Sequence, residues 1–256
     1  MSINFELPQA ADTDETPVVT PDAEPAAVED AALSRYLHQH LADIDALPTY
    51  RPRIGVIIPA YNEAESIEDV LRGLLAQTRL PDEIHLIVNN TKDDTFELAA
   101  PFAGPHKGPK VAKGQKRQRT EVFVHDIGEN PDKKVGALNY GFTLIQDADY
   151  LLGVDGDTVL APNAVEKLEQ EITSDTRIGG ISAIYSIDDT KIKGLVAKLL
   201  IAGQRTQFAA FNMQNMLRGR NMAVLGGQCS IFSMKALRAV MTENHQQTPW
   251  VNDSEV

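Results

Sequence analysis

The stretch RIGVIIPAYNEAESIEDVLRGLLAQ, residues 53–77, joins two different patterns of hydrophobicity. Its first part, RIGVIIP, is a continuous apolar run of the length of a buried strand. In its second part Asn62 is placed to cap a helix, with Glu65 three residues further on. The apolar residues that follow recur at helical spacing and would line one helix face: Ile67, Val70, Leu71, Leu74 and Leu75. The stretch therefore predicts a buried strand followed by an amphipathic helix.

The same alternation of short apolar runs and amphipathic stretches continues towards the C-terminus. Further strands are expected in EIHLIVNN (83–90), EVFVHDI (121–127), YLLGVD (150–155), GGISAIYSI (179–187) and AVLGGQCSIFS (223–233). Helices are expected over 93–102, 133–146, 163–172 with Pro162 in the first turn, about 191–218, and 234–243. Strands that alternate with helices in this way predict an α/β fold with a mostly parallel central sheet.

Composition separates an acidic N-terminal part from the rest of the chain. The formal net charge is −12, but residues 1–30 hold eight acids and no Lys or Arg. Residues 1–29, rich in Pro, Ala and acid, are predicted to be a disordered tail, and residues 30–50 a helix and linker. The acidity thus says nothing about the partners of the folded domain.

The sequence lacks several features that would indicate secretion, a membrane location or a nucleic-acid partner. The single cysteine excludes an internal disulfide, and the acidic N-terminus is unlike a secretory signal. The apolar stretch GLVAKLLIAG (194–203) is too short to span a bilayer, so no membrane span and a cytoplasmic location are expected. Residues 101–120 are interpreted as a surface insertion whose six basic residues lack the interleaved aromatics of a nucleic-acid site: Lys107, Lys110, Lys113, Lys116, Arg117 and Arg119.

Polar residues follow three of the predicted strands, in PAYNE (59–63), NNTKDD (89–94) and DGDT (155–158). The carboxyl ends of parallel strands meet at one edge of a sheet, where ligands bind. Gly156 lets the backbone turn, so that Asp155 and Asp157 can serve one site together. Carboxylates with a phosphate partner suit Mg²⁺ or Mn²⁺. A solvated turn and a haloacid-dehalogenase-like phosphatase with Asp155 as nucleophile are the alternatives, although in that family the motif usually opens the domain.

With IPAYNE, IVNNTKDDT, KVGALNYG and DGDT in this order, the chain resembles the inverting family 2 glycosyltransferases, which have the GT-A (nucleotide-diphospho-sugar transferase) fold. The resemblance runs from about Arg53 to the C-terminus. It implies a Rossmann-like nucleotide-sugar-binding half over residues 51–160 and an acceptor-binding half over residues 161–256. The expected donor is a nucleotide-diphosphate sugar, with UDP favoured, and the acceptor is a glycan, lipid or protein hydroxyl.

The resemblance also assigns roles to single residues. It places Pro59, Ala60, Tyr61 and Glu63 against the nucleoside, Lys134 near the diphosphate, and Asp155 and Gly156 near the ribose. Asp155 and Asp157 would bind Mn²⁺ or Mg²⁺. In the following strand, Gly227 and Gln228 are expected to contact the acceptor or leaving group, and a backbone role for the glycines is the alternative. Asn89 occupies the position where the family usually has the Asp that reads the base. An amide can donate and accept, so Asn89 can still pair with a uracil edge.

The family's catalytic base is the Asp of an E-D pair after a Gly-rich strand and a helix. Here the acids after those elements are Asp253 and Glu255, in WVNDSEV, and Asp253 is the expected base. Alternatively the E-D pair lies beyond Val256, and the chain is a truncated transferase that binds donor without turnover.

Overall fold

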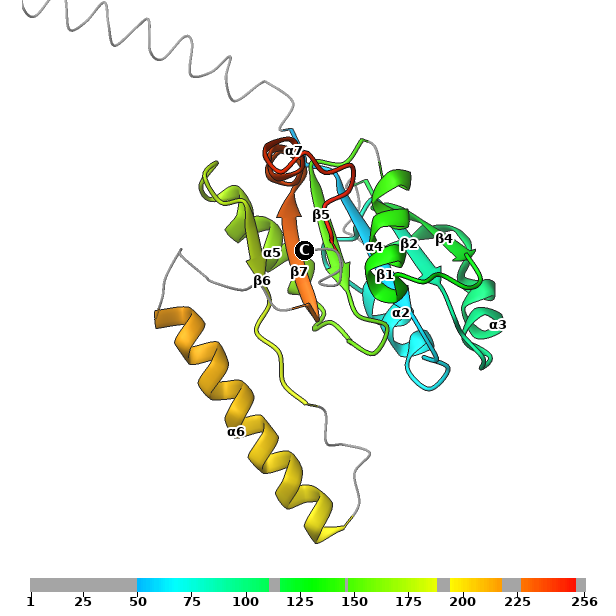
Figure 1. Ribbon diagram of the computed structural model, residues 1–256, viewed down its shortest axis with the longest axis vertical. Helices are drawn as coiled ribbons and strands as arrows, with labels where there is room; N and C mark the ends of the chain where they lie inside the picture. Colours follow the sequence, from blue (N-terminus) through cyan, green and yellow to red (C-terminus); the bar gives the residue numbers. More distant parts are fainter. Residues whose placement is uncertain (1–49, 111–115, 146, 188–193, 218–226, 252–256) are drawn as a thin grey trace, which may run out of the picture. The chain divides into compact units, whose positions relative to one another are not determined.

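The centre of the fold is a seven-stranded sheet with the order β3-β4-β2-β1-β5-β7-β6 (Figure 1). The computed structural model describes residues 50–110, 116–145, 147–187, 194–217 and 227–251. Four neighbouring strands are parallel, as the apolar runs predict: β1 (Ile54–Ala60), β2 (Glu83–Val88), β4 (Arg119–Asp126) and β5 (Tyr150–Val154). The predicted mostly parallel sheet is confirmed.

The outer strands run antiparallel to their inner neighbours. β3 (Gly104–Lys107) pairs with β4, so the predicted surface insertion over residues 101–120 contains an edge strand. On the other side β7 (Cys229–Ser233) pairs with β5, and β6 (Gly180–Ser182) pairs with β7. Strands from both predicted halves of the chain thus share one sheet.

Helices cover both faces of the sheet. One face is covered by α2 (Ile67–Leu75), α3 (Thr95–Ala99) with the short 3₁₀ turn η1 (Ala100–Phe102), and α5 (Ala164–Thr173), and the other by α4 (Lys133–Leu144) and α7 (Met234–Glu243). A further helix, α6 (Leu195–Leu217), lies between β6 and β7 in the chain. The expected cap at Asn62 is wrong, because α2 begins at Ile67 and Ser66 occupies its N-cap position. Pro162 likewise precedes the Asn163 N-cap of α5 and does not open the helix.

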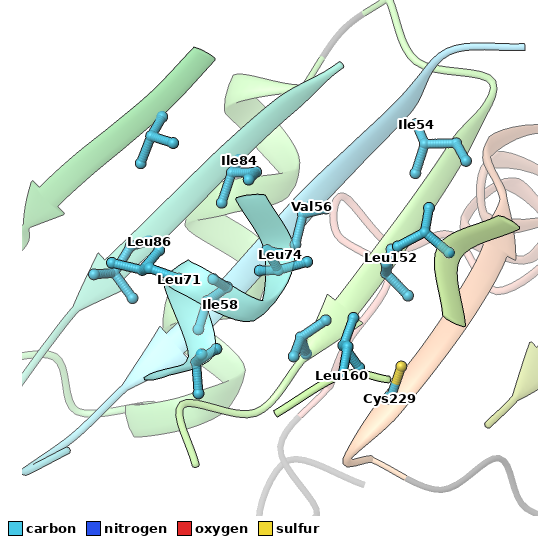
Figure 2. Close-up of a cluster of buried hydrophobic side chains, with 14 of the residues drawn as sticks. Ile54, Val56, Ile58, Leu71, Leu74, Ile84, Leu86, Leu152, Leu160 and Cys229 are labelled. Carbon is cyan, nitrogen blue, oxygen red and sulfur yellow. The ribbon is translucent and has the colours of Figure 1, made fainter. Parts of the chain in front are cut away.

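The two faces of β1 bury alternate residues in two separate cores. On one face Ile54, Val56 and Ile58 pack against α2, α3 and α5, and Figure 2 shows Leu71, Leu74 and Leu152 in this cluster. On the other face Ile57 packs with residues of α4 and α7. There Gly141 of α4 lies so close that an added Cβ would be 2.7 Å from Ile57 Cγ2. α4 is therefore fixed tightly to the sheet.

Helix α6 contacts the segment that follows β6. The side chain of Asn212 donates a hydrogen bond to the carbonyl oxygen of Tyr185 (3.2 Å), and the rings of Tyr185 and Phe208 meet edge to face. No helix in the described part of the chain is long and apolar enough to cross a bilayer. The predicted tail over 1–29, the predicted helix and linker over 30–50 apart from Tyr50, and the expected base Asp253 lie outside the described residues.

Candidate active site

A cavity of about 950 Å³ lies at the carboxyl ends of the four parallel strands. Every strand-end motif found in the sequence contributes to its wall: Pro59 and Ala60 at the end of β1 with Tyr61 and Glu63 after it, Asn89 to Asp93 after β2, and Asp155, Gly156 and Asp157 after β5. Lys133 and Lys134 enter it from the start of α4. The structure thus brings together all the residues that the sequence assigned to nucleotide and metal.

Hydrogen bonds between two loops fix the β1 side of the pocket. Asn62 adopts a left-handed backbone conformation (φ 56°), and its side-chain oxygen accepts the amide of Lys92 (2.9 Å). The amide of Glu63 donates to Thr95 Oγ1 (2.8 Å), and the amide of Ala64 donates to Asp93 (3.1 Å). Burial raises the pKa of Asp93, but its hydrogen bonds outweigh burial and leave the pKa below its ordinary value of 3.8. The ionised Asp93 thus holds the two loops together.

Two hydrogen bonds to the side-chain oxygen of Asn90 orient the side chain of Asn89. Asn90 Oδ1 accepts the backbone N–H of Asn130 (3.1 Å), which can only donate. The same oxygen accepts the side-chain NH₂ group of Asn89 (2.8 Å). Asn89 is buried and lines the pocket, and the bond to Asn90 uses one of the two hydrogens of its NH₂ group. The carbonyl oxygen and the second N–H of Asn89 are therefore left to accept and to donate a hydrogen bond.

The start of α4 brings positive charge to the pocket. Lys134 Nζ lies 2.6 Å from Asp155 Oδ1, and the side chains are 51% and 23% exposed. The free N–H groups at the start of a helix also favour anions. Lys134 therefore lines the pocket and pairs with Asp155 there.

A tight turn after β5 places Asp155 and Asp157. Only glycine fits between them, because a Cβ on Gly156 would lie 2.8 Å from Glu63 Cγ and 3.3 Å from the Pro59 carbonyl oxygen. Ser66 Oγ lies 3.0 Å from the Gly156 carbonyl oxygen and 3.0 Å from the Glu63 carboxylate, so the two acceptors share its single hydrogen. Burial, followed by the charges of Asp157 and Asp155, raises the pKa of Glu63 above its ordinary value of 4.5 despite the bond from Ser66. The acids thus lie close enough to interact.

This donor set fits a hard divalent cation that also takes ligands from a substrate. Asp155 and Asp157 supply carboxylate oxygens at one edge of the pocket. Within the described ranges no three His, Cys, Asp or Glu residues form a complete metal cage. Mg²⁺ and Mn²⁺ commonly complete their coordination with water and phosphate oxygens.

Gly227 and Gln228, which are expected to contact the sugar acceptor, lie beside Lys134 and Asp155. The Gln228 carbonyl oxygen accepts the amide of Asp155 (2.9 Å), and a Cβ on Gly227 would lie 3.7 Å from Lys134 Nζ. Gln228 Oε1 is buried without a hydrogen-bond partner among the described residues. The adjacent Cys229 is inert, since burial and then the charge of Asp155 raise its thiol pKa to about 12.

Other pocket residues were not identified from the sequence. Asp126 and Glu129 line the cavity from the end of β4, and Phe96 and Glu97 line it from α3. The strand-end rule that identified Asp155 applies equally to Asp126, which follows a predicted strand. The role of Ser66 had no such signal, because its partner Gly156 lies 90 residues away in the sequence.

Comparison with known proteins identifies the fold and the family of the chain. The structure is similar to that of a mannosyltransferase from Pyrobaculum calidifontis in complex with GDP-Man and Mn²⁺, with a TM-score of 0.52 at 19% identity over 75% of this chain and 48% of that one. The profile described as "Glycosyl transferase family 2" matches residues 55–241. The chain belongs to glycosyl transferase family 2. Its mostly parallel sheet with flanking helices is the GT-A fold expected for the family.

Two relatives within this family are synthases. Hyaluronan synthase from Streptococcus pyogenes is 30% identical over 198 residues, which are 77% of this chain and 44% of that protein. Poly-beta-1,6-N-acetyl-D-glucosamine synthase from Staphylococcus aureus (strain COL) is 30% identical over 131 residues, which are 50% of this chain and 27% of that protein. The family 2 glycosyltransferase described here therefore spans less than half the length of these relatives. The match does not favour the phosphatase or the inactive truncated transferase.

Proposed function

We propose that this family 2 glycosyltransferase moves a sugar from a UDP-linked donor to an acceptor hydroxyl, with inversion at the anomeric carbon and with Mn²⁺ or Mg²⁺. The observation that carries the proposal is the meeting of Lys134 and Asp155 at 2.6 Å in the pocket that also contains Asp157 and Asn89. One pocket thus holds groups suited to a base, a diphosphate and a cation.

The amide of Asn89 supports recognition of the base. The Asn89 carbonyl oxygen can accept the N3–H of uracil, and the second N–H of its NH₂ group can donate to a uracil carbonyl oxygen. Guanine also carries an N–H on its edge, so GDP is the competitor against which UDP selectivity is measured. The mannosyltransferase of similar fold is in complex with GDP-Man.

The charged groups support stabilisation of the leaving nucleotide. Asp155 and Asp157 would hold the cation, which when bound supplies positive charge against the charge that develops on the diphosphate. Lys134 and the first amides of α4 add donors on the same side. The Mn²⁺ in the mannosyltransferase complex supports the choice of metal.

Asp253 is the proposed general base, taking the proton of the acceptor hydroxyl as its oxygen attacks the anomeric carbon and the nucleotide departs. A positioned base contributes on the order of 10²- to 10⁴-fold to the rate. The two relatives are a hyaluronan synthase and a poly-N-acetylglucosamine synthase, which supports a glycan hydroxyl over a lipid or protein acceptor.

The test is titration calorimetry of UDP with and without Mn²⁺. We expect Asp157→Ala to abolish the Mn²⁺-dependent part of binding, and Asp94→Ala, which removes an exposed carboxylate outside the pocket lining, to leave it unchanged. Mn²⁺-dependent binding that survives Asp157→Ala would refute the metal site. Release of UDP from a UDP-sugar distinguishes a transferase from a domain that only binds donor, and a phosphorylated Asp155 would support the phosphatase.

A further inference from the structure

Two consecutive asparagines follow β2, and their backbones are bonded to different neighbours. The backbone N–H of Asn89 donates to the carbonyl oxygen of Ala60, at the end of β1 (3.1 Å). The backbone N–H of Asn90 donates to the carbonyl oxygen of Gly128, in the loop after β4 (2.9 Å). Both asparagines line the pocket. Their side chains therefore start from fixed positions, and the direction of each amide group remains to be decided.

The direction of the Asn90 amide is set by a backbone group that can only donate. Asn90 Oδ1 accepts the N–H of Asn130 (3.1 Å), and the reverse orientation would turn the NH₂ group of Asn90 towards this N–H, with no acceptor between them. Asn90 has a left-handed backbone conformation (φ 55°), which asparagine adopts more readily than most residues. The loop after β4 thus orients the amide of Asn90.

The same oxygen selects one of the two orientations of the Asn89 amide. Asn90 Oδ1 lies 2.8 Å from the side-chain nitrogen of Asn89, which donates to it. Turning the Asn89 amide by 180° would bring two acceptor oxygens together and lose this hydrogen bond. Asn89 is only 2% exposed, so water is a poor replacement for the lost partner. The amide of Asn89 is therefore held in one orientation.

This orientation matters because an amide can match either uracil or cytosine. Uracil carries an N–H at N3 beside a carbonyl oxygen at position 4, whereas cytosine carries an acceptor nitrogen at N3 beside an NH₂ group. An amide with its oxygen opposite N3 and its N–H opposite position 4 matches uracil. The same amide turned by 180° presents its N–H to N3 and matches cytosine. An asparagine that could turn freely would therefore accept both bases.

We propose that Asn90 is a positioning residue that makes the pocket selective for UDP over CDP, because its side-chain oxygen holds the Asn89 amide with the Asn89 oxygen opposite N3 of the base. The proposal rests on the function proposed above, since it concerns the base of the same donor. It assigns the contact with the base to Asn89 and the choice between the two pyrimidines to Asn90.

The experiment measures the Kd of UDP and of CDP, each with Mn²⁺, by titration calorimetry of the wild-type chain, Asn90→Gly and Asn90→Asp. Glycine removes the amide and tolerates the left-handed backbone. Aspartate keeps an oxygen that can accept from both Asn130 and Asn89. We expect the wild-type chain to bind UDP about tenfold more tightly than CDP, because the match to CDP costs a buried hydrogen bond.

Asn90→Gly should bring the two affinities together. If the freed Asn89 amide populates both orientations equally, each base is met by half of the molecules, so UDP binding should weaken about twofold and CDP binding should tighten about fivefold. A gain in CDP affinity is a result that damage to the pocket does not produce. Asn90→Asp should keep the wild-type preference for UDP, because any repulsion from its charge acts on both diphosphates.

Asn62→Gly is the matched control. It also removes an amide from a left-handed residue at a strand end (φ 56°), but the side-chain oxygen of Asn62 accepts the backbone N–H of Lys92 and does not bond to Asn89. We therefore expect it to leave the ratio of the UDP and CDP affinities unchanged. An unchanged ratio in Asn90→Gly, or an equal loss of both affinities, would overturn the role of Asn90, as would a wild-type chain without a preference for UDP.

A second measurement needs no nucleotide. Hydrogen exchange of the Asn130 backbone N–H, followed by NMR, should be about tenfold faster in Asn90→Gly than in the wild-type chain, and close to wild type in Asn90→Asp. Equal exchange in the wild-type chain and Asn90→Gly would refute the bond that orients Asn90. If the wild-type chain binds neither nucleotide, the proposed function fails together with the selectivity. If it prefers UDP and Asn90→Gly keeps that preference, the role of Asn90 alone is refuted.

Discussion

Replacing Lys134 with Gln should change nucleotide binding and metal binding in opposite directions. Lys134 Nζ lies 2.6 Å from Asp155 Oδ1, where two unit charges attract by about 1.6 kcal/mol in bulk water. The lysine side chain is 51% exposed, so screening and lost side-chain entropy reduce the contribution of the pair to about 1 kcal/mol or less. We therefore expect the melting temperature to change little.

The expected change in Mn²⁺ binding and in UDP binding depends on how each ligand interacts with Lys134 and Asp155. Without nucleotide, the ammonium of Lys134 competes with a cation for Asp155, so its removal should tighten Mn²⁺ binding by about fivefold, equivalent to about 1 kcal/mol. A diphosphate instead gains from Lys134, and a hydrogen bond to a charged group contributes about 1.5–3 kcal/mol. UDP binding should therefore weaken by roughly 10- to 100-fold.

Calorimetric titration of Mn²⁺ alone and of UDP with Mn²⁺ measures both changes. Lys133→Gln is the matched control, because Lys133 also lines the pocket while the ion pair to Asp155 is made by Lys134. It removes the same charge from the general field and should weaken UDP binding by less than about threefold, since exposed charges are screened by salt. Equal losses in both variants, or weaker Mn²⁺ binding in Lys134→Gln, would refute the reasoning.

Three further predictions concern stability, each measured by urea unfolding. A Cβ on Gly136 would collide with the side chain of Asn130. Gly136→Ala should therefore lower the free energy of unfolding by about 1–3 kcal/mol and also weaken UDP binding. An unchanged free energy of unfolding would show that the loop containing Asn130 moves aside without cost. Arg79 is buried with its Nε 3.0 Å from both carboxylate oxygens of Glu169, so Arg79→Ala should cost about 3–5 kcal/mol, and a loss below 1 kcal/mol would contradict this. Burial, and then the charge of a neighbouring histidine, lower the pKa of His125 from 6.5, so unfolded chains bind protons more readily and stability should fall as the pH drops below about 6.5. His125→Gln should lessen this fall, and an identical pH profile would contradict the assignment.

The fold was predictable wherever one pattern decided the structure alone. Apolar runs identified β1, β2 and β5, because strands buried on both faces need mostly apolar residues. β4 is only partly buried, and Val122, Phe123 and Val124 identified it. The edge strand β3 was not predicted, since Gly104–Lys107 carries no apolar pattern and is a strand only through its pairing with β4. The prediction that Asn62 caps a helix was wrong for a related reason. The side-chain oxygen of Asn62 accepts the backbone N–H of Lys92, from another loop.

The candidate site could likewise be predicted from the sequence only in part. Asp155, Gly156 and Asp157 could be identified because a strand end, a glycine and two acids are adjacent in the chain. The orientation of Asn89 could not, because it depends on Asn90 and on an amide 40 residues later, at Asn130. The two hydrogen bonds between the Asn139 side chain and the Trp250 backbone could not be predicted, because the residues are 111 positions apart.

The sequence by itself determined the α/β class, the order of the central elements and the chemical types gathered at the strand ends. These follow from local periodicity and from the rule that parallel strands end at one edge of a sheet. Only the tertiary structure decided which group each polar side chain binds: Lys134 to Asp155, Ser66 to Gly156 and Asn139 to Trp250. Hydrogen bonds and ion pairs act over about 3 Å, and residues come that close through packing of the whole sheet and not through spacing along the chain.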